Sequence, residues 1–359
     1  MLVARIIGKY YLTHAREFFL WFGSHTVFQS RCARRASSMS CAHVNGIHAS
    51  TRSYSSDSEM SGPRNLSEVT REELQRFLDS FDVVFSDCDG VLWILEKSIE
   101  GSIECLKKLQ DLGKKVHLVS NNSTLSFDQY QKKVEKGGMD LKPEQLIITS
   151  KVISWYLKKI NFTDEAFVIA SRAFRDTFAS AGIKMTPKEV PLIVENNVTV
   201  SVNNTFNVSS SKAVIVDFWL NIDYSKMAYA INCLKAGDTL FLAGPMDEWI
   251  ICGEDMHILG PGPIIDLLST QSGKKPIVCG KPSAALKDYI LEICDVKDKK
   301  RCLFIGDTLQ TDMRFAKDCG FQTLFVASGL DKIEDALQKP ETQPDYYVSS
   351  LGALLNTLN

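Results

Sequence analysis

From residue 66 onward, short apolar runs alternate with longer segments in which apolar residues recur every three or four positions. The first pattern is typical of buried strands and the second of amphipathic helices. In the first half of the chain the strands are predicted at 81–86 and 115–119, and the helices at 66–80, 98–112 and 126–136. Because strands and helices alternate, we expect a parallel sheet covered by helices, an α/β fold.

The same alternation continues through the middle of the chain. The predicted strands are 166–170, 213–219 and 239–242, and the predicted helices are 152–159, 172–180, 224–234 and 264–270. Residues 196–211 are rich in Asn, Ser, Thr and Val, which favours a hairpin or a linker. Three further strands, 276–279, 301–305 and 322–326, are expected to rejoin the first sheet.

Composition and charge narrow the class of protein. The chain has 359 residues, of which 45% are hydrophobic and 23% charged, which suits a globular protein of two domains and excludes a disordered or fibrous one. No apolar run approaches the roughly 20 residues needed to cross a bilayer. The formal net charge of −2 gives no indication of a nucleic-acid partner.

The N-terminal segment differs from the rest in charge. Residues 1–56 carry seven Lys and Arg residues against the single acid Glu17, and they are rich in serine. This composition is typical of a mitochondrial presequence, here with cleavage after Tyr54 and a mature protein in the matrix. The alternative is an extended or disordered leader over 1–59, with Met60 as the working start and a cytoplasmic protein.

The ten cysteines are scattered, and no two of them form a C-x-x-C pair. A structural zinc site or a disulfide framework is therefore not expected. Free thiols in a reducing compartment fit this distribution better.

Two acids stand at the end of a predicted strand, in the segment Asp87-Cys88-Asp89-Gly90. Alternate residues of an extended chain point to the same side, so both carboxylates face one point where the chain leaves the sheet. Such a pair can act as a nucleophile and a general acid/base. A turn or a fragment of a calcium loop is the alternative interpretation.

Three more polar clusters follow predicted strands. They are Ser120-Asn121-Asn122-Ser123, Gly280-Lys281-Pro282, and Gly306-Asp307-Thr308 with Asp312. Each has an ordinary explanation when taken alone, as a helix cap, a solvated lysine or a turn. Ligands of open α/β sheets bind at the carboxyl ends of the strands, so together the clusters indicate a single site at which an anion would bind.

In this order the motifs resemble those of the haloacid dehalogenase (HAD) superfamily of aspartate-nucleophile phosphatases. Their flanking residues, together with Pro344-Asp345-Tyr346-Tyr347-Val348, are similar to the branch of 4-nitrophenylphosphatases, which includes phosphoglycolate and pyridoxal phosphate phosphatases. The resemblance extends over about 66–359. It implies a Rossmann-like parallel core with a cap domain.

The spacing of the motifs locates that cap. Ser120 and Lys281 are 161 positions apart, whereas 33 separate Asp87 from Ser120 and 26 separate Lys281 from Asp307. An α/β domain must therefore be inserted between the second and third motifs, the place of the large C2-type cap in this branch. The expected division is a core of 60–152 and 272–359 with a cap of 153–271. By resemblance, the cap also suggests a homodimer.

The resemblance further implies roles for the motif residues. Asp87 is the expected nucleophile and Asp89 the general acid/base. Mg²⁺ is expected on Asp87, Asp89 and Asp307, with Asp312 orienting the metal's surroundings. Ser120, Asn121, Asn122 and Lys281 are expected to bind the phosphoryl group of a small phosphorylated metabolite, such as phosphoglycolate, glycerol phosphate or 4-nitrophenyl phosphate.

Alternative functions remain open. They are a pyridoxal phosphate phosphatase, a regulatory protein phosphatase, and a catalytically silent binding protein of the same fold. A P-loop kinase is excluded because G-x-x-x-x-G-K-[ST] is absent.

The cap departs from the family pattern at two places. In the stretch Asp217-Phe218-Trp219-Leu220-Asn221, Trp219 stands where the branch has an acid and Asn221 where it often has histidine. A Thr-Asn pair of the branch is replaced by Gly244-Pro245. We expect Trp219 and Asn221 to alter specificity, with an aromatic ring favouring aryl leaving groups. The alternative is that Trp219 packs in the cap core.

Overall fold

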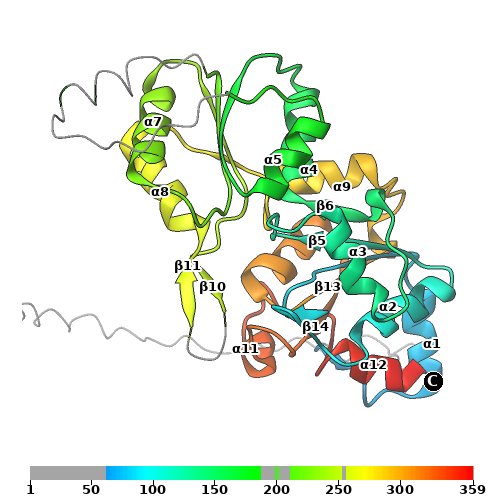
Figure 1. The fold of residues 1–359 in the computed structure, drawn as a ribbon. Coiled ribbons are helices and arrows are strands. Elements are labelled where there is room, and N and C mark those ends of the chain that lie inside the picture. Colours follow the sequence, from blue (N-terminus) through cyan, green and yellow to red (C-terminus); the bar gives the residue numbers. More distant parts are fainter. Residues whose placement is uncertain (1–61, 187–198, 200–201, 203–210, 253–255, 359) are drawn as a thin grey trace, which may run out of the picture. The chain divides into compact units, whose positions relative to one another are not determined.

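The computed structural model describes residues 62–186, 199, 202, 211–252 and 256–358 (Figure 1). The predicted presequence and leader lie outside the described residues, as does nearly all of 196–211. Across the described ranges, no helix is both long and apolar enough to span a bilayer.

The larger sheet has seven strands, and all of its neighbours are parallel. Their spatial order is β1 (Arg64–Asn65), β15 (Tyr346–Val348), β14 (Gln322–Val326), β13 (Cys302–Gly306), β2 (Val83–Ser86), β5 (Lys115–Ser120) and β6 (Leu146–Ile148). Phe85 of β2 pairs with Phe304 of β13 on one side and with His117 of β5 on the other. The predicted α/β class is confirmed, and β2 lies inside the sheet.

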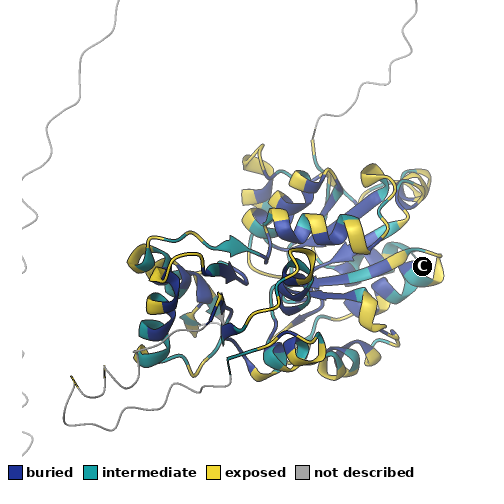
Figure 2. Cartoon of the chain, turned by 90° about the horizontal axis from the view of Figure 1, so that it is seen from above, coloured by how far each residue is buried: buried dark blue, intermediate teal, exposed yellow. Residues whose placement is uncertain are grey.

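Helices cover both faces of this sheet. One face packs against α1 (Arg71–Asp79), α2 (Ser102–Asp111), α3 (Phe127–Glu135) and α12 (Leu351–Leu358). The other packs against α4 (Thr149–Lys159), α9 (Ala284–Ile293) and α10 (Arg314–Cys319). Successive strand residues point to opposite faces, so Val84 joins the first core and Phe85 the second. Figure 2 shows the strands buried and the outer helix faces exposed.

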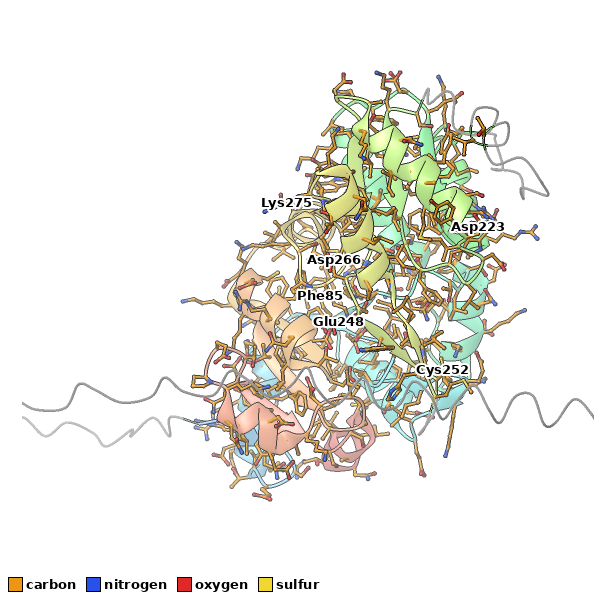
Figure 3. All side chains as sticks on the ribbon, turned by 90° about the vertical axis from the view of Figure 1, so that its left-hand side faces the viewer. Phe85, Asp223, Glu248, Cys252, Asp266 and Lys275 are labelled. Atoms are coloured by element: carbon orange, nitrogen blue, oxygen red, sulfur yellow. The ribbon has the colours of Figure 1, made fainter. Side chains whose placement is uncertain are left out.

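The inserted segment forms a second parallel sheet. Its order is β12 (Ile277–Val278), β9 (Leu240–Ala243), β8 (Ala213–Val216) and β7 (Ala166–Ile169). It is accompanied by α5 (Arg172–Ser180), α7 (Tyr224–Lys235) and α8 (Pro261–Ser272). Two antiparallel strands, β10 (Trp249–Ile251) and β11 (His257–Leu259), form a hairpin in which Glu248 and Cys252 flank β10 (Figure 3).

The expectation that residues 276–279 join the larger sheet is wrong. Ile277 pairs with Leu242 of β9, so β12 belongs to the second sheet. An apolar run predicts that a segment is buried but does not say which sheet it joins. The expected division at 153 and 271 stays a prediction.

Several element bounds differ from the predicted ones for local reasons. Helix α1 begins at Arg71 and not at residue 66, because Thr70 caps it in a capping box with Glu73 and the amide of Leu66 donates to the carbonyl of Tyr347 in β15 instead. Helix α8 begins at Pro261, since proline suits the first turn of a helix. Two short strands, β3 (Trp93–Ile94) and β4 (Lys97–Ser98), and helix α11 (Ile333–Gln338) complete the α-helices and strands of the described residues.

Candidate active site

Four chain segments that follow strands meet at one edge of the larger sheet. Asp87 follows β2, Asn121 follows β5 and Asp307 follows β13, and these three strands are neighbours. Lys281 follows β12 of the second sheet and reaches the same place, where its backbone amide donates to Oδ1 of Asn121 at 2.8 Å. Residues distant in the sequence are thus brought together at the carboxyl ends of parallel strands.

Lys281 lies between two carboxylates at the centre of this cluster. Its Nζ atom is 2.7 Å from Oδ1 of Asp87 and 2.7 Å from Oδ1 of Asp312, and the residue is 2% exposed. Burial opposes a charge on Lys281, but the carboxylates of Asp312 and Asp87 outweigh it and raise its pKa. Burial and the charge of Asp312 raise the pKa of Asp87 well above its usual range.

Asp307 and Asp312 are fixed by backbone amides and a hydroxyl. Oδ2 of Asp312 accepts from the amide of Asp307 at 3.2 Å and from Oγ1 of Thr308 at 2.7 Å. Oδ2 of Asp307 accepts from the amide of Leu330 at 2.8 Å. At Gly90, φ is +82°, and a Cβ atom there would lie 2.3 Å from Oδ2 of Asp307. Glycine therefore permits both the turn after Asp89 and the close approach of Asp307.

The cluster has the chemistry of a site for a hard cation. Oxygen atoms of Asp87, Asp307 and Asp312 lie within 4.8 Å of one another, and Oδ1 of Asp307 is buried without a hydrogen-bond partner among the described residues. Three buried carboxylates face one ammonium group, so negative charge is in excess. Mg²⁺ prefers carboxylate oxygens, and the residues present fit it.

Asp89 is held differently from Asp87. It is half-buried, and Oδ1 accepts a hydrogen bond of 3.1 Å from the indole Nε1 of Trp93. Burial raises the pKa of Asp89, against the opposing effect of that hydrogen bond. A raised pKa favours the protonated carboxyl that a general acid requires.

The loop after β5 brings hydroxyl and amide groups to the same place. The Ser120 hydroxyl accepts from the amide of Asn122 at 3.0 Å and from the hydroxyl of Tyr130 at 3.1 Å. The side-chain amide of Asn121 donates to Asp247 at 3.2 Å and to the carbonyl of Lys281 at 3.3 Å. These contacts fix Ser120 and Asn121 beside Lys281. Binding of a phosphoryl group by Ser120, Asn121 and Asn122 stays a prediction.

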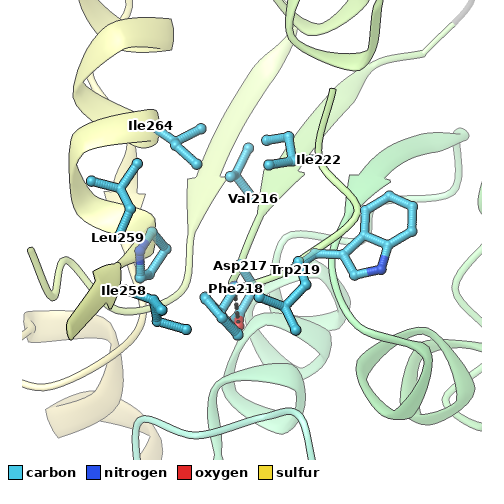
Figure 4. Close-up of a pocket in the computed structure, with 10 residues that line it drawn as sticks. Val216, Asp217, Phe218, Trp219, Ile222, Ile258, Leu259 and Ile264 are labelled. Carbon is cyan, nitrogen blue, oxygen red and sulfur yellow. Dashed lines mark hydrogen bonds between the residues drawn. The ribbon is translucent and has the colours of Figure 1, made fainter. Parts of the chain in front are cut away.

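The two cap residues singled out in the sequence lie apart from these contacts. Trp219 packs against the core of the second sheet, and its ring centroid is 4.7 Å from the Arg175 guanidinium and 5.1 Å from Nζ of Lys226. Asn221 is exposed. An apolar cavity of about 190 Å³ lies beside Trp219, but the ring points away from Ile258 and Ile264, which line it (Figure 4). This geometry favours the packing alternative, while specificity stays a prediction.

Sequence reasoning missed two acids, the buried Asp217 and the half-buried Asp247. Each follows a strand of the second sheet and contacts the loop after β5, Asp217 at Ser123 and Asp247 at Asn121. The signal in the sequence was weak, because Asp217 lies inside the predicted strand 213–219 and Asp247 lies five positions beyond the predicted strand 239–242.

Comparisons with known proteins identify the family of the chain. The model of haloacid dehalogenase-like hydrolases matches residues 84–184, and a second model of HAD-hydrolase-like proteins matches 278–354. The chain is 31% identical over 301 residues to phosphoglycolate phosphatase 1A, chloroplastic, of Arabidopsis thaliana, covering 82% of each chain. It is 31% identical over 291 residues to 4-nitrophenylphosphatase of Schizosaccharomyces pombe, covering 80% of this chain and 97% of the relative.

A solved structure has the same fold. The p-nitrophenyl phosphatase from Archaeoglobus fulgidus superposes with a TM-score of 0.65 at 23% identity, over 77% of this chain and 99% of that one. The matched segments contain Asp87, Ser120, Lys281 and Asp307, the residues that meet at the sheet edge. The chain therefore belongs to the haloacid dehalogenase-like hydrolases, in the branch of the 4-nitrophenylphosphatases and phosphoglycolate phosphatases.

Proposed function

We propose that the chain is a magnesium-dependent phosphomonoester phosphatase in which Asp87 is the nucleophile and Asp89 the general acid/base. The observation that carries the proposal is the buried cluster of Asp87, Asp307 and Asp312 around Lys281 at the carboxyl ends of β2 and β13. The named relatives act on phosphoglycolate and on 4-nitrophenyl phosphate. Small phosphorylated metabolites are accordingly the proposed substrates.

The first half of the reaction transfers the phosphoryl group to the protein. A carboxylate oxygen of Asp87 attacks phosphorus, and the bond from phosphorus to the leaving oxygen breaks. Asp89 donates its proton to that oxygen, so the alcohol leaves neutral. The hydrogen bond from Trp93 to Asp89 keeps the carboxyl oriented during this step.

The second half returns the enzyme to its starting state. Asp89, now a carboxylate, takes a proton from water, whose oxygen attacks phosphorus and breaks the acyl phosphate bond of Asp87. Lys281 provides positive charge next to Asp87, and the hydroxyl of Ser120 and the groups of Asn121 would hold phosphoryl oxygens.

Mg²⁺ would be held by Asp87, Asp307 and the Asp89 backbone. When bound, it supplies charge that offsets the repulsion between the Asp87 carboxylate and a dianionic ester. The proposed role of Asp312 is to fix Lys281 and the 307–308 backbone, since both of its oxygens are already engaged there.

The test is a panel of phosphomonoesters assayed with Mg²⁺ and again with a chelator. The panel contains 4-nitrophenyl phosphate, phosphoglycolate, glycerol phosphate, pyridoxal phosphate and a phosphopeptide, and the Asp87→Asn variant is the control for contaminating phosphatases. We expect hydrolysis of small esters that requires Mg²⁺ and is lost in the variant. Folded parent protein that hydrolyses no member of the panel would favour the catalytically silent alternative.

A further inference from the structure

A buried carboxylate outside the catalytic cluster joins the two sheets. Asp217 directly follows β8 and is 2% exposed. Its Oδ1 accepts hydrogen bonds from Oγ of Ser123 at 2.6 Å and from the amide of Phe218 at 2.7 Å, and its Oδ2 accepts from Oγ1 of Thr149 at 2.6 Å. Hydrogen bonds to a carboxylate at such distances are among the stronger ones in proteins.

Two of the partners of Asp217, Ser123 and Thr149, belong to segments that directly follow strands of the larger sheet. Thr149 begins α4 directly after β6, and Ser123 lies in the loop after β5, which also carries Ser120 and Asn121. The contact therefore runs from the end of one sheet to the loop that is proposed to bind the phosphoryl group.

Two other side chains of the second sheet hold the same loop. Ser171, after β7, donates from Oγ to the backbone oxygen of Ser123 at 3.0 Å. Asp247, beyond β9, accepts from the side-chain amide of Asn121 at 3.2 Å. Three neighbouring strands, β7, β8 and β9, thus each contribute one contact to residues 121–123. Asp217 provides the shortest of them, and among the described residues the Ser123 hydroxyl forms no other hydrogen bond.

The space for this carboxylate depends on Gly244, at the end of β9. A Cβ atom on residue 244 would lie 2.0 Å from Oδ2 of Asp217, far inside van der Waals contact. Glycine is required at residue 244 because of the lack of space and not because of the backbone conformation, since its φ is not in the left-handed region. The Asp217 carboxylate can therefore occupy this position only if residue 244 has no Cβ atom.

The surroundings of Asp217 destabilise its charged form. Among the described residues, Asp217 forms no ion pair, and the titratable groups that face it are Asp247 and the thiol of Cys279. Burial raises the pKa of Asp217 to about 6, against the opposing hydrogen bonds from Ser123, Thr149 and Phe218, and the charge of Asp247 adds to the rise. Burial keeps Cys279 neutral by raising its pKa to about 12. The carboxylate is thus held by neutral donors alone.

We propose that Asp217 is a positioning residue, whose carboxylate fastens the loop after β5 through Ser123 and so holds Ser120 and Asn121 where the phosphoryl group binds. This role rests on the proposed phosphatase function. Through this contact the second sheet would position the residues that bind the phosphoryl group, in addition to any contact of its own with the leaving group.

The test compares Asp217→Asn with Ser123→Ala, their double variant and the matched control Asp266→Asn, an exposed acid of α8. The first readout needs no activity: amide hydrogen exchange of peptides covering 120–125, without substrate. We expect exchange there to be about tenfold faster in Asp217→Asn and Ser123→Ala, and unchanged in Asp266→Asn. Circular dichroism and thermal unfolding establish that each variant is folded.

The second readout is kinetic, with 4-nitrophenyl phosphate as substrate and inorganic phosphate as competitive inhibitor. We expect KM and the inhibition constant of phosphate to rise about tenfold in both single variants, and no further in the double variant, because the two side chains act through one contact. In the parent, KM should rise as the pH falls from 7 to 5.5, and the rise should be smaller in Asp217→Asn, where the acids of the catalytic cluster still titrate but residue 217 does not.

The outcomes separate the two proposals. A folded parent without phosphatase activity contradicts the proposed function. The exchange measurement still tests whether Asp217 fastens the loop after β5. Unchanged amide exchange of residues 120–125 in folded Asp217→Asn would overturn the proposed positioning role of Asp217, even if the enzyme is active. Additive kinetic effects of the two substitutions would also overturn it, since Ser123 would then not transmit the effect of Asp217.

Discussion

The ammonium group of Lys281 lies 2.7 Å from Oδ1 of Asp87, and both residues are buried. The contact joins the segment after β12 of the second sheet to the segment after β2 of the larger sheet. A cation in this position stabilises the Asp87 carboxylate in spite of its burial, and it is placed to offset the charge of a phosphoryl group on Asp87. The catalytic predictions start from this pair.

Asp87→Asn should reduce the turnover of 4-nitrophenyl phosphate by at least about a thousandfold, since an amide is a poor nucleophile and no other carboxylate occupies the same place. The fold should persist, because Asn has the same shape and its amide oxygen can still accept from the Cys88 amide. Circular dichroism checks the fold. Near-normal hydrolysis by a folded variant would show that Asp87 is not the nucleophile.

Asp307→Asn should chiefly weaken the use of Mg²⁺. Oδ1 of Asp307 is buried without a hydrogen-bond partner among the described residues, as expected of an oxygen that binds a cation. We expect the Mg²⁺ concentration for half-maximal activity to rise at least about tenfold. An unchanged Mg²⁺ requirement would count against this assignment.

Lys281→Ala is the matched comparison for that variant, because it removes the cation of the same cluster and leaves Asp307 in place. It should chiefly raise KM and the inhibition constant of inorganic phosphate, since Lys281 faces the phosphoryl oxygens in the proposed mechanism. If the two variants had the same effect on the Mg²⁺ requirement, the assigned division between metal and phosphate would fail.

Trp219→Ala separates the two interpretations of that residue. Since the ring packs against the core of the second sheet and lies near the cations of Arg175 and Lys226, we expect a loss of about 1–3 kcal/mol in the free energy of unfolding. The values of kcat/KM for 4-nitrophenyl phosphate and phosphoglycolate should fall by similar factors. A loss confined to 4-nitrophenyl phosphate would instead support stacking of the ring on an aryl leaving group.

The sequence predicted the catalytic edge better than the surroundings of that edge. Asp87, Ser120 and Asp307 could be placed together because apolar runs predict strands, and the ends of neighbouring parallel strands meet at one edge of the sheet. Lys281 reaches the same edge from β12 of the second sheet. The assignment of β12 to a sheet failed because hydrophobicity reports burial but not the identity of the neighbour. The contact of Asp217 with Ser123 joins positions 94 apart, and the pattern along one chain does not encode such a pairing.

Gly244→Ala should destabilise the fold by about 1–3 kcal/mol, because its Cβ atom would lie 2.0 Å from Oδ2 of Asp217. The cost should be smaller in an Asp217→Ala background, where the clashing oxygen is absent. Gly62→Ala is the control, since a Cβ atom there meets nothing within 4 Å. Equal costs of Gly244→Ala in both backgrounds, measured by denaturant unfolding, would show that other atoms limit the space at residue 244.

Asp217 should also contribute to the pH dependence of the free energy of unfolding. Its pKa is about 6 in the folded protein and ordinarily 3.8, so between pH 4 and 6 the folded state binds more protons than the unfolded state. Stability must then fall as the pH rises through this window and stay lower above it. A shift of this size corresponds to about 3 kcal/mol as an order of magnitude, and Asp217→Asn lacks this contribution.

The stability of Asp217→Asn relative to the parent should therefore increase from pH 4 to 7, while its KM at pH 7 is higher than that of the parent. A side chain that merely supports the fold would change stability and activity in the same direction. Opposite directions are expected of a buried charge that costs stability and positions a functional loop. Denaturant unfolding of both proteins at pH 4, 5, 6 and 7, with KM measured at pH 7, checks the sign. If the stability difference between the two proteins does not change with pH, the Asp217 carboxylate does not titrate in this window. The proposed pH dependence of the Asp217 contact is then wrong.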